Sequence, residues 1–258
     1  MLIRKTWRNL PIYLVAEDLC RPGAKMIFRN RADAGAKLAE KLAALFTASN
    51  TIPYCVVGLP RGGVPVALEV AKKLSSPLEL IESKKLPYPG QPEFAIGAVS
   101  ADGIVVLNHD VPGREKMTEG ERTRWHDYIE QQSKLLLEKT KAVEAQFYRL
   151  AGRRKASLKG KTVIIVDDGI ATGMTALAAV ETARKQGAAK VILAAPVMSK
   201  ESMEELKSHC DSIVTLSVPD PFCAVGLYYQ DFSQTRDEEV VQALRDSTGF
   251  ASTTSQAL

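Results

Sequence analysis

The chain has 258 residues, 45% of which are hydrophobic, and it carries a net formal charge of +4. These values are typical of a globular protein with a full core, and they exclude a chain that is disordered over most of its length. The charge is compatible with an anionic ligand but too small to indicate a nucleic-acid partner, so we expect none.

The cysteines and the N-terminal segment bear on the compartment in which the protein works. Cys20, Cys55, Cys210 and Cys223 lie far apart, with neither a CxxC pair nor metal-site spacing, so we expect reduced thiols. Charged residues interrupt the segment 1–25, which offers neither a secretory apolar core nor a membrane span. We therefore expect a cytoplasmic protein without membrane contact.

The first well-patterned segment begins after Met26. Residues 1–25 are expected to be an N-terminal extension or a misassigned start, with an irregular N-terminal arm as the alternative. Asp33 is a candidate N-cap for an amphipathic helix that ends before Ser49. The apolar residues at helical spacing in this helix are Ala34, Leu38, Leu42 and Leu45.

The next segments alternate between short apolar runs and helical periodicity, which favours a parallel sheet covered by helices. They are a strand at 54–59, a glycine-rich turn at 60–63, a helix at 64–74 and a strand at 78–81.

A stretch rich in chain breakers comes next. Residues 83–93 hold three prolines and a glycine, which predicts a long mobile loop. The runs 94–100 and 103–107 predict two short strands joined by a tight turn at Asp102 and Gly103. We expect these two strands to form a hairpin.

A long charged stretch at 114–150 contains few breakers and predicts one long helix or a helical pair, as part of an insertion over about 111–157. The basic residues that follow, from Arg153 to Lys161, are expected either to be solvated or to lie over an anionic site.

The second half repeats the alternation and ends in a helical tail. The predicted elements are a strand at 162–166, a helix at 174–186, a strand at 190–195, a helix at 200–209 and a strand at 212–217. The polar segment 248–258 has no packing pattern and is expected to be a disordered tail. The whole pattern predicts an α/β fold of three layers, with a central parallel sheet and helices on both faces, as a single domain over 26–247.

The strongest chemical signal is the run 163–175, in which an apolar strand ends in two acids and a small-residue loop enters a helix. Asp167 and Asp168 project toward the crevice where parallel sheets bind ligands, and they can accept hydrogen bonds from the vicinal hydroxyls of a ribose. The loop brings backbone N–H groups and a helix N-terminus toward a phosphate. The predicted substrate-binding residues of this loop are Gly169, Ala171, Thr172, Gly173, Met174 and Thr175.

This run resembles the phosphoribosyl pyrophosphate-binding motif of type I phosphoribosyltransferases, in which two acids and two variable residues precede a small-Thr-Gly-x-Thr loop. A Walker phosphate loop is excluded because no GxxxxGK[ST] occurs. An ordinary capped strand-to-helix connection is the structural alternative. Together with the runs 28–33, 58–65 and 84–97, the motif is similar to an uncharacterised phosphoribosyltransferase-like group, over roughly residues 26 to 245. The resemblance implies the fold of that family.

A second run, 58–65, resembles the pyrophosphate loop of the family. Gly62 and Gly63 let the backbone wrap an anion, while Arg61 adds a charged contact or orders the loop. The resemblance implies a cis non-proline peptide between Leu59 and Gly62.

Lys84 and Lys85 match in position the loop that closes over pyrophosphate in related enzymes, although two surface lysines at a strand end would look the same.

The resemblance implies transfer of ribose 5-phosphate from 5-phosphoribosyl 1-pyrophosphate to a nitrogenous base, with Mg²⁺ as cofactor and release of pyrophosphate. Asp167, Asp168 and Arg61 are the implied catalytic residues. The two acids would hold the metal indirectly, through ribose hydroxyls or water. Ala171 stands where some purine-specific relatives have Asp, which leaves the general base and a hypoxanthine-guanine type open.

Base recognition in the family comes from a hood, here expected over about 219–245. Phe222 and Tyr228 are the candidate stacking residues, with Tyr229 and Phe232 nearby, and a plain aromatic cluster is the alternative.

Two other functions compete with transfer. One is a non-catalytic regulatory or nucleic-acid-binding module that senses a phosphoribosyl ligand through this fold, using the basic segment near Arg153. The other is a ribose-phosphate hydrolase or phosphorolytic enzyme. The acceptor base, the physiological role and the oligomeric state stay open, with a homodimer among the alternatives.

Overall fold

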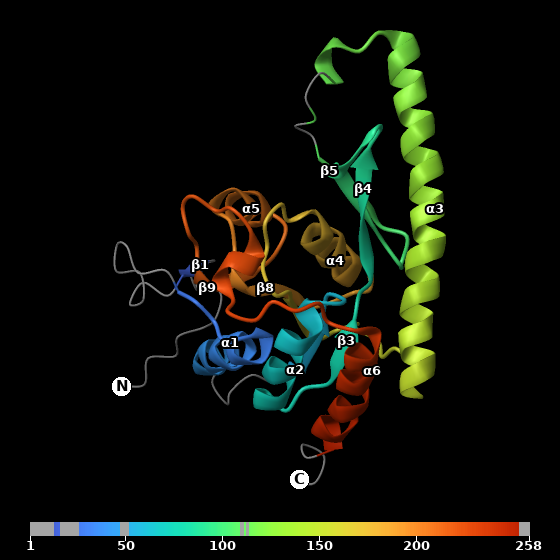
Figure 1. Cartoon of the computed structure of the whole chain (residues 1–258). Coiled ribbons are helices and arrows are strands. Elements are labelled where there is room, and N and C mark those ends of the chain that lie inside the picture. Colours follow the sequence, from blue (N-terminus) through green and yellow to red (C-terminus); the bar gives the residue numbers. More distant parts are fainter. Residues whose placement is uncertain (1–12, 16–25, 47–51, 109–110, 112–113, 253–258) are drawn as a thin grey trace, which may run out of the picture.

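A computed structural model describes residues 13–15, 26–46, 52–108, 111 and 114–252. Helices and strands alternate along most of this part of the chain (Figure 1). The helices are α1 (Arg31–Leu45), α2 (Gly63–Lys73), α3 (Glu119–Ala151), α4 (Met174–Lys185), α5 (Lys200–Leu206) and α6 (Asp237–Asp246), with 3-10 helices η3 (Arg114–Lys116), η4 (Val225–Tyr228) and η5 (Ser247–Ser252). The strands are β1 (Tyr13–Val15), β2 (Tyr54–Gly58), β3 (Leu78–Leu80), β4 (Ser83–Tyr88), β5 (Gln91–Ser100), β6 (Val105–Leu107), β7 (Thr162–Val166), β8 (Lys190–Val197) and β9 (Ser212–Ser217).

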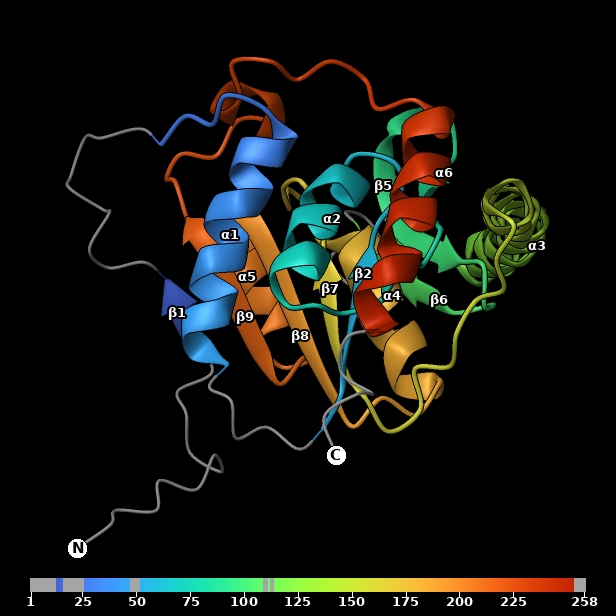
Figure 2. The same ribbon diagram turned by 90° about the horizontal axis from the view of Figure 1, so that it is seen from below.

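The main sheet is parallel, and its strands follow the order β1-β9-β8-β7-β2-β3. Helices α1 and α2 cover one face, whereas α4 and α5 cover the other (Figure 2). Side chains of β7 alternate between the two resulting cores: Ile164 and Val166 pack with α1 and α2, and Val163 and Ile165 pack with α4. This double burial explains why the strand reads as a continuous apolar run. The predicted three-layer α/β fold is confirmed.

The strand order reverses between β2 and β7. From β2 the chain proceeds through α2 to β3 on one side, and from β7 it proceeds through α4 to β8 on the other. The last residues of the two strands are in register, because Gly58 pairs with Val166. The loops that leave these ends therefore diverge to opposite faces and open a crevice, which is where open α/β sheets bind ligands.

A second sheet contains β4, β5 and β6 in antiparallel order. Residues 83–88 form β4 and residues 91–93 begin β5, so the predicted mobile loop over 83–93 is wrong except for the turn at 89–90. Pro87 is accommodated at a register shift, where the missing N–H costs little, and Gly90 makes the turn with a φ of 76°. The predicted hairpin of the next two strands is confirmed by the pairing of β5 with β6.

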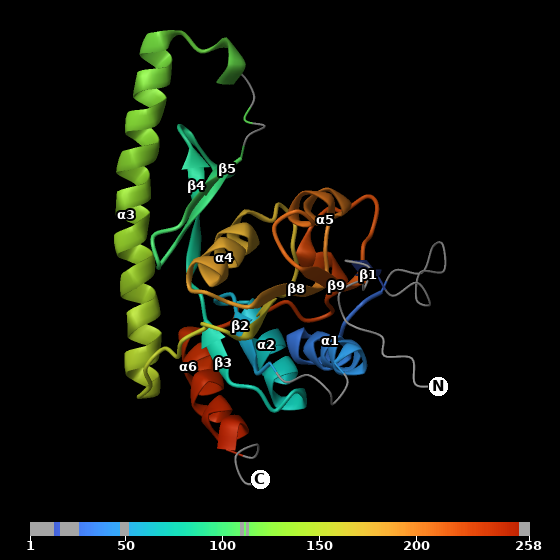
Figure 3. The same ribbon diagram turned by 180° about the vertical axis from the view of Figure 1, so that it is seen from behind.

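The long charged stretch forms one helix, α3, that stands beside the small sheet (Figures 1 and 3). A capping box between Thr118 and Glu121 starts it, and Gly152 in the left-handed conformation ends it. Its N-terminal half packs on the hairpin through Trp125, which clusters with Leu86 and other residues. Its C-terminal half contacts α6.

The basic segment after α3 is partly built into the core. Arg153 Nη2 donates to Glu79 Oε1 at 2.6 Å, and Glu79 is fully buried. Lys155 pairs with Glu144. Burial of Glu79 requires such a partner, because an uncompensated carboxylate is costly in a core. Arg153 and Lys155 are therefore held by ion pairs within the protein and are not simply solvated.

The ends of several elements differ from the sequence predictions. Asn30, not Asp33, is the N-cap of α1, and its side chain accepts a hydrogen bond from the Asp33 backbone N–H at 3.0 Å. Strand β1, inside the predicted extension 1–25, pairs with β9. The rest of that extension lies outside the described residues, as does 253–258, whereas η5 occupies the start of the predicted tail.

Candidate active site

Two loops meet where β2 and β7 end. The Leu59 N–H donates to the Val166 carbonyl at 3.0 Å. A Cβ placed on Gly62 would lie 2.1 Å from Asp168 Oδ2, and one on Gly63 would lie 2.8 Å from Asp167 Cα. Only glycine fits such an approach, so the Arg-Gly-Gly loop rests directly against the two acids. The structure thus brings together the two runs that the sequence singles out a hundred residues apart.

The peptide between Pro60 and Arg61 is cis. It lies between Leu59 and Gly62, where the family resemblance implies such a bond, so this expectation is confirmed.

The two carboxylates at the end of β7 are largely buried and differ in their surroundings. Burial raises the pKa of Asp167 well above its ordinary value, and the negative charge of Asp168 raises it further. Burial also raises the pKa of Asp168, but the Arg31 guanidinium opposes this rise. Asp167 therefore keeps its proton to a higher pH than Asp168.

Arg31 is a site residue to which the sequence analysis assigns no role. Its Nε donates to Asp168 Oδ2 at 2.8 Å, and both side chains are almost buried, with exposed fractions of 12% and 13%. Nη1 donates to the Ser233 carbonyl at 2.6 Å, and the guanidinium lies 4.0 Å from the centre of the Phe232 ring. One side chain thus links the acid to the C-terminal segment. Arg31 falls within the run 28–33, but its partners are 137 and 202 residues away, so no local pattern identifies it.

The backbone of Asp168 is held from the same side. Tyr229 Oη donates to the Asp168 carbonyl at 2.5 Å. Phe28 packs on the Tyr229 ring, and the Gln230 N–H donates to the Phe28 carbonyl at 2.8 Å. Segments from both ends of the described chain therefore support this acid.

The loop between β7 and α4 offers unused backbone donors. Among the described residues, the N–H groups of residues 171–176 have no hydrogen-bond acceptor. Gly173 turns the chain into α4 with a φ of 71°. The carbonyl of Ala171 accepts hydrogen bonds from the Ser199 and Ser202 hydroxyls at 2.8 and 2.7 Å. The loop is thus fixed while these N–H groups keep their hydrogen-bonding capacity, an arrangement suited to a phosphate.

Arg61 lies at the rim of the crevice. Its guanidinium is 44% exposed and sits 3.3 Å from Asp237 Oδ1 at the start of α6. A cavity of about 290 Å³ lies here, lined by Arg61 and residues 234–238. Because an exposed ion pair of this kind is weak, Arg61 can exchange Asp237 for an anionic ligand at little cost.

The two lysines of β4 point to opposite faces of the small sheet. Lys85 pairs with Ala98, which packs on α4, and Ser83 on the same face donates to the Thr175 carbonyl at 3.3 Å. Lys84 faces the other way and lies 3.5 Å from Glu82. Because side chains alternate along a strand, only Lys85 is on the face where α4 begins.

The carboxyl group of Glu82 is buried where the chain leaves the main sheet for β4. Burial, with a smaller effect of the Glu144 charge, raises the pKa of Glu82 to about 7, although Lys84 and Arg61 act in the opposite direction. Its ordinary value is 4.5. Between these two values the folded state binds more protons at Glu82 than the unfolded state does.

Glu82 should therefore make stability fall as pH rises. Its contribution is fully present below pH 4.5 and is lost as pH rises through about 7. Urea unfolding across this range should show wild type losing stability relative to Glu82→Gln, by about 1.4 kcal/mol for every pH unit between the folded and unfolded pKa values. Parallel pH profiles of the two proteins would show that the carboxyl is not buried in this way.

The aromatic residues of the C-terminal segment do not all lie as expected. Tyr228 is buried in the core and stacks on Phe222, with ring centres 5.7 Å apart. Because the ring of Tyr228 is covered, it offers no face on which a base could stack, and the prediction for Tyr228 is corrected. Phe222 is half-buried against the same core. Phe232 is 38% exposed, but Arg31 lies over its ring.

The acids fit the metal expected for this motif. Among the described residues, no group of three or more His, Cys, Asp or Glu could hold a metal ion alone. Mg²⁺ commonly binds through one or two carboxylates together with substrate oxygens and water. Asp167 and Asp168, adjacent at a crevice beside a phosphate-type loop, provide such a donor set.

No helix in the described ranges has both the length and the apolar content to span a membrane.

Comparison with known proteins agrees with the geometry. A protein of Mycobacterium tuberculosis strain H37Rv, provisionally named a phosphoribosyl transferase, is 44% identical over 218 residues, which make up 84% of this chain and 46% of that protein. The chain thus spans about half the length of the curated relatives it matches. The crystal structure of TT1426 from Thermus thermophilus is 40% identical, with a TM-score of 0.69, and the match covers 86% of this chain and 99% of that one.

The family model described as phosphoribosyl transferase domain matches residues 23–231, most of the chain. It covers the loop at 59–62, both acids and the run 171–175. The resemblance found in the sequence is confirmed, and the chain belongs to the phosphoribosyl transferase domain family.

Proposed function

We propose that this protein transfers the ribose 5-phosphate group of 5-phosphoribosyl 1-pyrophosphate to a nitrogenous base, with Mg²⁺ as cofactor, and releases pyrophosphate. The observation that supports this best is the contact between the glycine loop and the two acids. It places a candidate pyrophosphate loop, a pair of diol-binding carboxylates and a phosphate-type loop around one crevice.

Each part has a distinct task in this reaction. The unused N–H groups of residues 171–176 bind the 5-phosphate, and Asp167 and Asp168 accept hydrogen bonds from the ribose hydroxyls. The C1–O bond to pyrophosphate breaks, and its electron pair leaves with the pyrophosphate. The lone pair of the base nitrogen then forms the new bond to C1. No protein nucleophile is needed, so catalysis rests on positioning and on charge.

Charge on the leaving pyrophosphate is stabilised by the backbone N–H groups of Arg61 and Gly62 and by the Arg61 and Lys85 side chains, whereas the Gly63 N–H donates to the Leu59 carbonyl at 3.0 Å. Mg²⁺, when bound, supplies positive charge to the pyrophosphate oxygens. Asp167 and Asp168 would hold it through ribose hydroxyls or water. The proton of the attacking nitrogen has no assigned acceptor, since Ala171 cannot take it.

Calorimetric titration with 5-phosphoribosyl 1-pyrophosphate and Mg²⁺ tests the proposal. We expect binding to wild type and none to the variant with Asp167→Asn and Asp168→Asn, because amides remove both negative charges and half of the acceptor oxygens. Glu204→Gln with Glu205→Gln, an adjacent exposed pair on α5, should bind like wild type. No binding to wild type, or equal binding to all three proteins, contradicts the proposal.

The two lysines of β4 offer a matched pair for the leaving-group side of the site. Lys85→Gln should weaken binding of pyrophosphate with Mg²⁺ by roughly tenfold or more, because a charged hydrogen bond is lost. Lys84→Gln should leave binding unchanged, since Lys84 lies on the opposite face. Titration of both variants with pyrophosphate shows which lysine contributes to binding. Equal losses of affinity in the two variants would show that the strand does not direct Lys85 to the site.

A further inference from the structure

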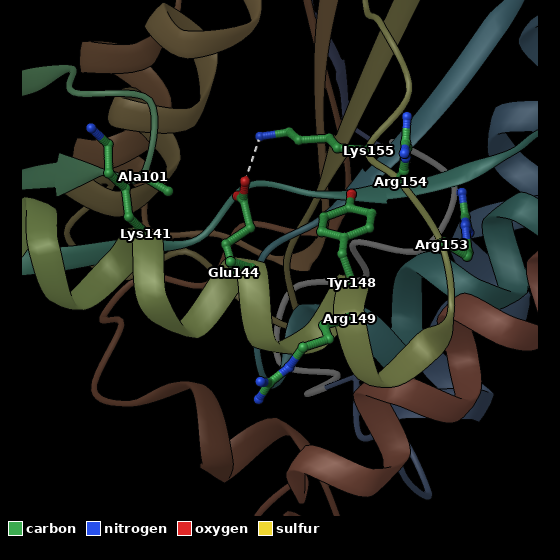
Figure 4. A pocket seen from close by; sticks show the side chains of 9 residues that line it. Ala101, Lys141, Glu144, Tyr148, Arg149, Arg153, Arg154 and Lys155 are labelled. Atoms are coloured by element: carbon green, nitrogen blue, oxygen red, sulfur yellow. Dashed lines mark hydrogen bonds and ion pairs between the residues drawn. The ribbon is translucent and has the colours of Figure 1, made fainter.

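We propose that a basic pocket beside the C-terminal half of α3 binds a phosphorylated small molecule through a chain of phosphoryl groups. The pocket has a volume of about 430 Å³, within the range of small-molecule sites. It lies between α3, the turn after β5 and the segment that follows α3 (Figure 4). None of its lining residues belongs to the candidate active site, so the proposal stands independently of the proposed function.

Cationic side chains dominate the lining. Lys141 and Arg154 line the pocket and are exposed, and among the described residues neither has an ion-pair partner. Lys155 donates to Glu144 at 2.8 Å and to Asp102 at 3.0 Å, which leaves one of its three N–H groups for a ligand. The pocket thus presents more positive charge than its own carboxylates neutralise.

The lining side chains come from two segments. In Figure 4, Lys141, Glu144 and Tyr148 extend from the same side of α3, and Lys155, on the segment after the helix, extends toward Glu144 with Arg154 next to it in the chain. Arg149 extends in the opposite direction from Lys141, so we do not count it among the cations that meet the ligand.

The floor of the pocket is fixed before any ligand binds. Glu144 is buried, and its Oε2 accepts a hydrogen bond from the Glu82 N–H at 3.0 Å. Tyr148 Oη donates to Glu79 Oε2 at 2.6 Å and accepts from the Leu80 N–H at 2.9 Å. These bonds tie the helix to β3 and to the start of β4. A ligand would therefore meet a wall that is already ordered, which lowers the cost of binding.

The charges favour several phosphoryl groups over one. A single anion would compete with Glu144 for Lys155 and gain little. A chain of phosphoryl groups long enough to contact more than one of Lys141, Lys155 and Arg154 gains several charged hydrogen bonds, because both ammonium and guanidinium groups bind phosphate well. The chain can belong to a nucleoside polyphosphate or to an inorganic polyphosphate.

Calorimetric titration at low ionic strength, with ATP and with inorganic tripolyphosphate as separate probes, tests the site. Lys141→Gln with Arg154→Gln removes two exposed cations of the pocket. Lys139→Gln with Lys159→Gln removes two exposed cations outside it, one on α3 and one in the segment after it. All titrations use the whole chain with Arg61→Gln and Lys85→Gln in the background, because these substitutions remove the side-chain cations proposed to bind pyrophosphate at the candidate active site.

We expect one binding event, weakened roughly tenfold to hundredfold by the pocket substitutions and unchanged by the control substitutions. Binding of ATP alone would identify a nucleotide ligand, and equal binding of both probes would identify the phosphate chain as the part recognised. If neither probe binds, or if pocket and control variants bind equally, the proposal is wrong. Unchanged thermal unfolding of the pocket variant would show that its loss of binding is not a loss of fold.

Discussion

Replacement of Arg31 by glutamine is expected to lower the free energy of unfolding by about 3–5 kcal/mol at neutral pH, because it leaves the nearly buried Asp168 carboxylate without its cation. The pKa of Asp168 should rise further, since Arg31 is what opposes the effect of burial. The loss of stability should shrink as pH falls and Asp168 takes up a proton. Urea unfolding at several pH values measures both effects.

The same substitution should abolish most binding of 5-phosphoribosyl 1-pyrophosphate, because a displaced Asp168 no longer reaches the ribose hydroxyls and a protonated Asp168 accepts fewer and weaker hydrogen bonds from them. Arg29→Gln is the matched control: Arg29 is 78% exposed and pairs with Asp33 on the surface. It should leave stability and binding near those of wild type. If the two variants had equal stability and equal affinity for the ligand, the ion pair with Arg31 would not be what holds Asp168 in place.

Gly63→Ala is expected to damage both the fold and the site. Its Cβ would lie 2.7 Å from the Val166 carbonyl oxygen and 2.8 Å from Asp167 Cα, so the backbone at the end of β7 would have to move. Overpacking of this kind costs about 1–3 kcal/mol. A displacement of about 1 Å between the glycine loop and the acids would lower turnover by roughly a hundredfold. Urea unfolding and pyrophosphate release give the two measurements.

Substitutions at two further glycines separate the effect on the site from the effect on the fold. At Gly62 the new Cβ meets the end of the Asp168 side chain at 2.1 Å, and this group can swing away. Gly62→Ala should therefore lose ligand binding without moving the backbone of β7, and its loss of stability should come from the ion pair between Asp168 and Arg31. Gly120→Ala, in the first turn of α3 with only Arg124 within 4 Å, should be neutral or slightly stabilising. A Gly63→Ala protein as stable and active as wild type would mean that the loops do not touch.

The main sheet and the two site loops could be predicted from the sequence because their signals are local. An apolar run such as 162–166 predicts a strand, and the helical spacing of apolar residues after Gly173 predicts a helix. The order of two acids, small residues and Thr between them identifies the phosphate-type loop. The face on which Lys85 lies follows from the register of β4 against β5. The sequence does not predict this register, because three prolines in the segment 83–93 indicate a loop and not a strand. Arg31 lies 137 residues from Asp168 and Tyr229 lies 61 residues from it, and pairing at such separations leaves no periodicity to detect.

Arg153 also bears on the order in which the protein can assemble during synthesis. It bonds to Glu79 in an early strand, and its Nη1 donates to the Leu244 carbonyl and to the Ser247 hydroxyl. The Glu79 carboxylate therefore lacks its cation until the ribosome has made residue 153, and the cation lacks its last acceptors until residue 247 has emerged. A nascent chain that stops short of α6 would leave polar groups of this network unpaired. Completion of the domain thus waits for nearly the whole chain.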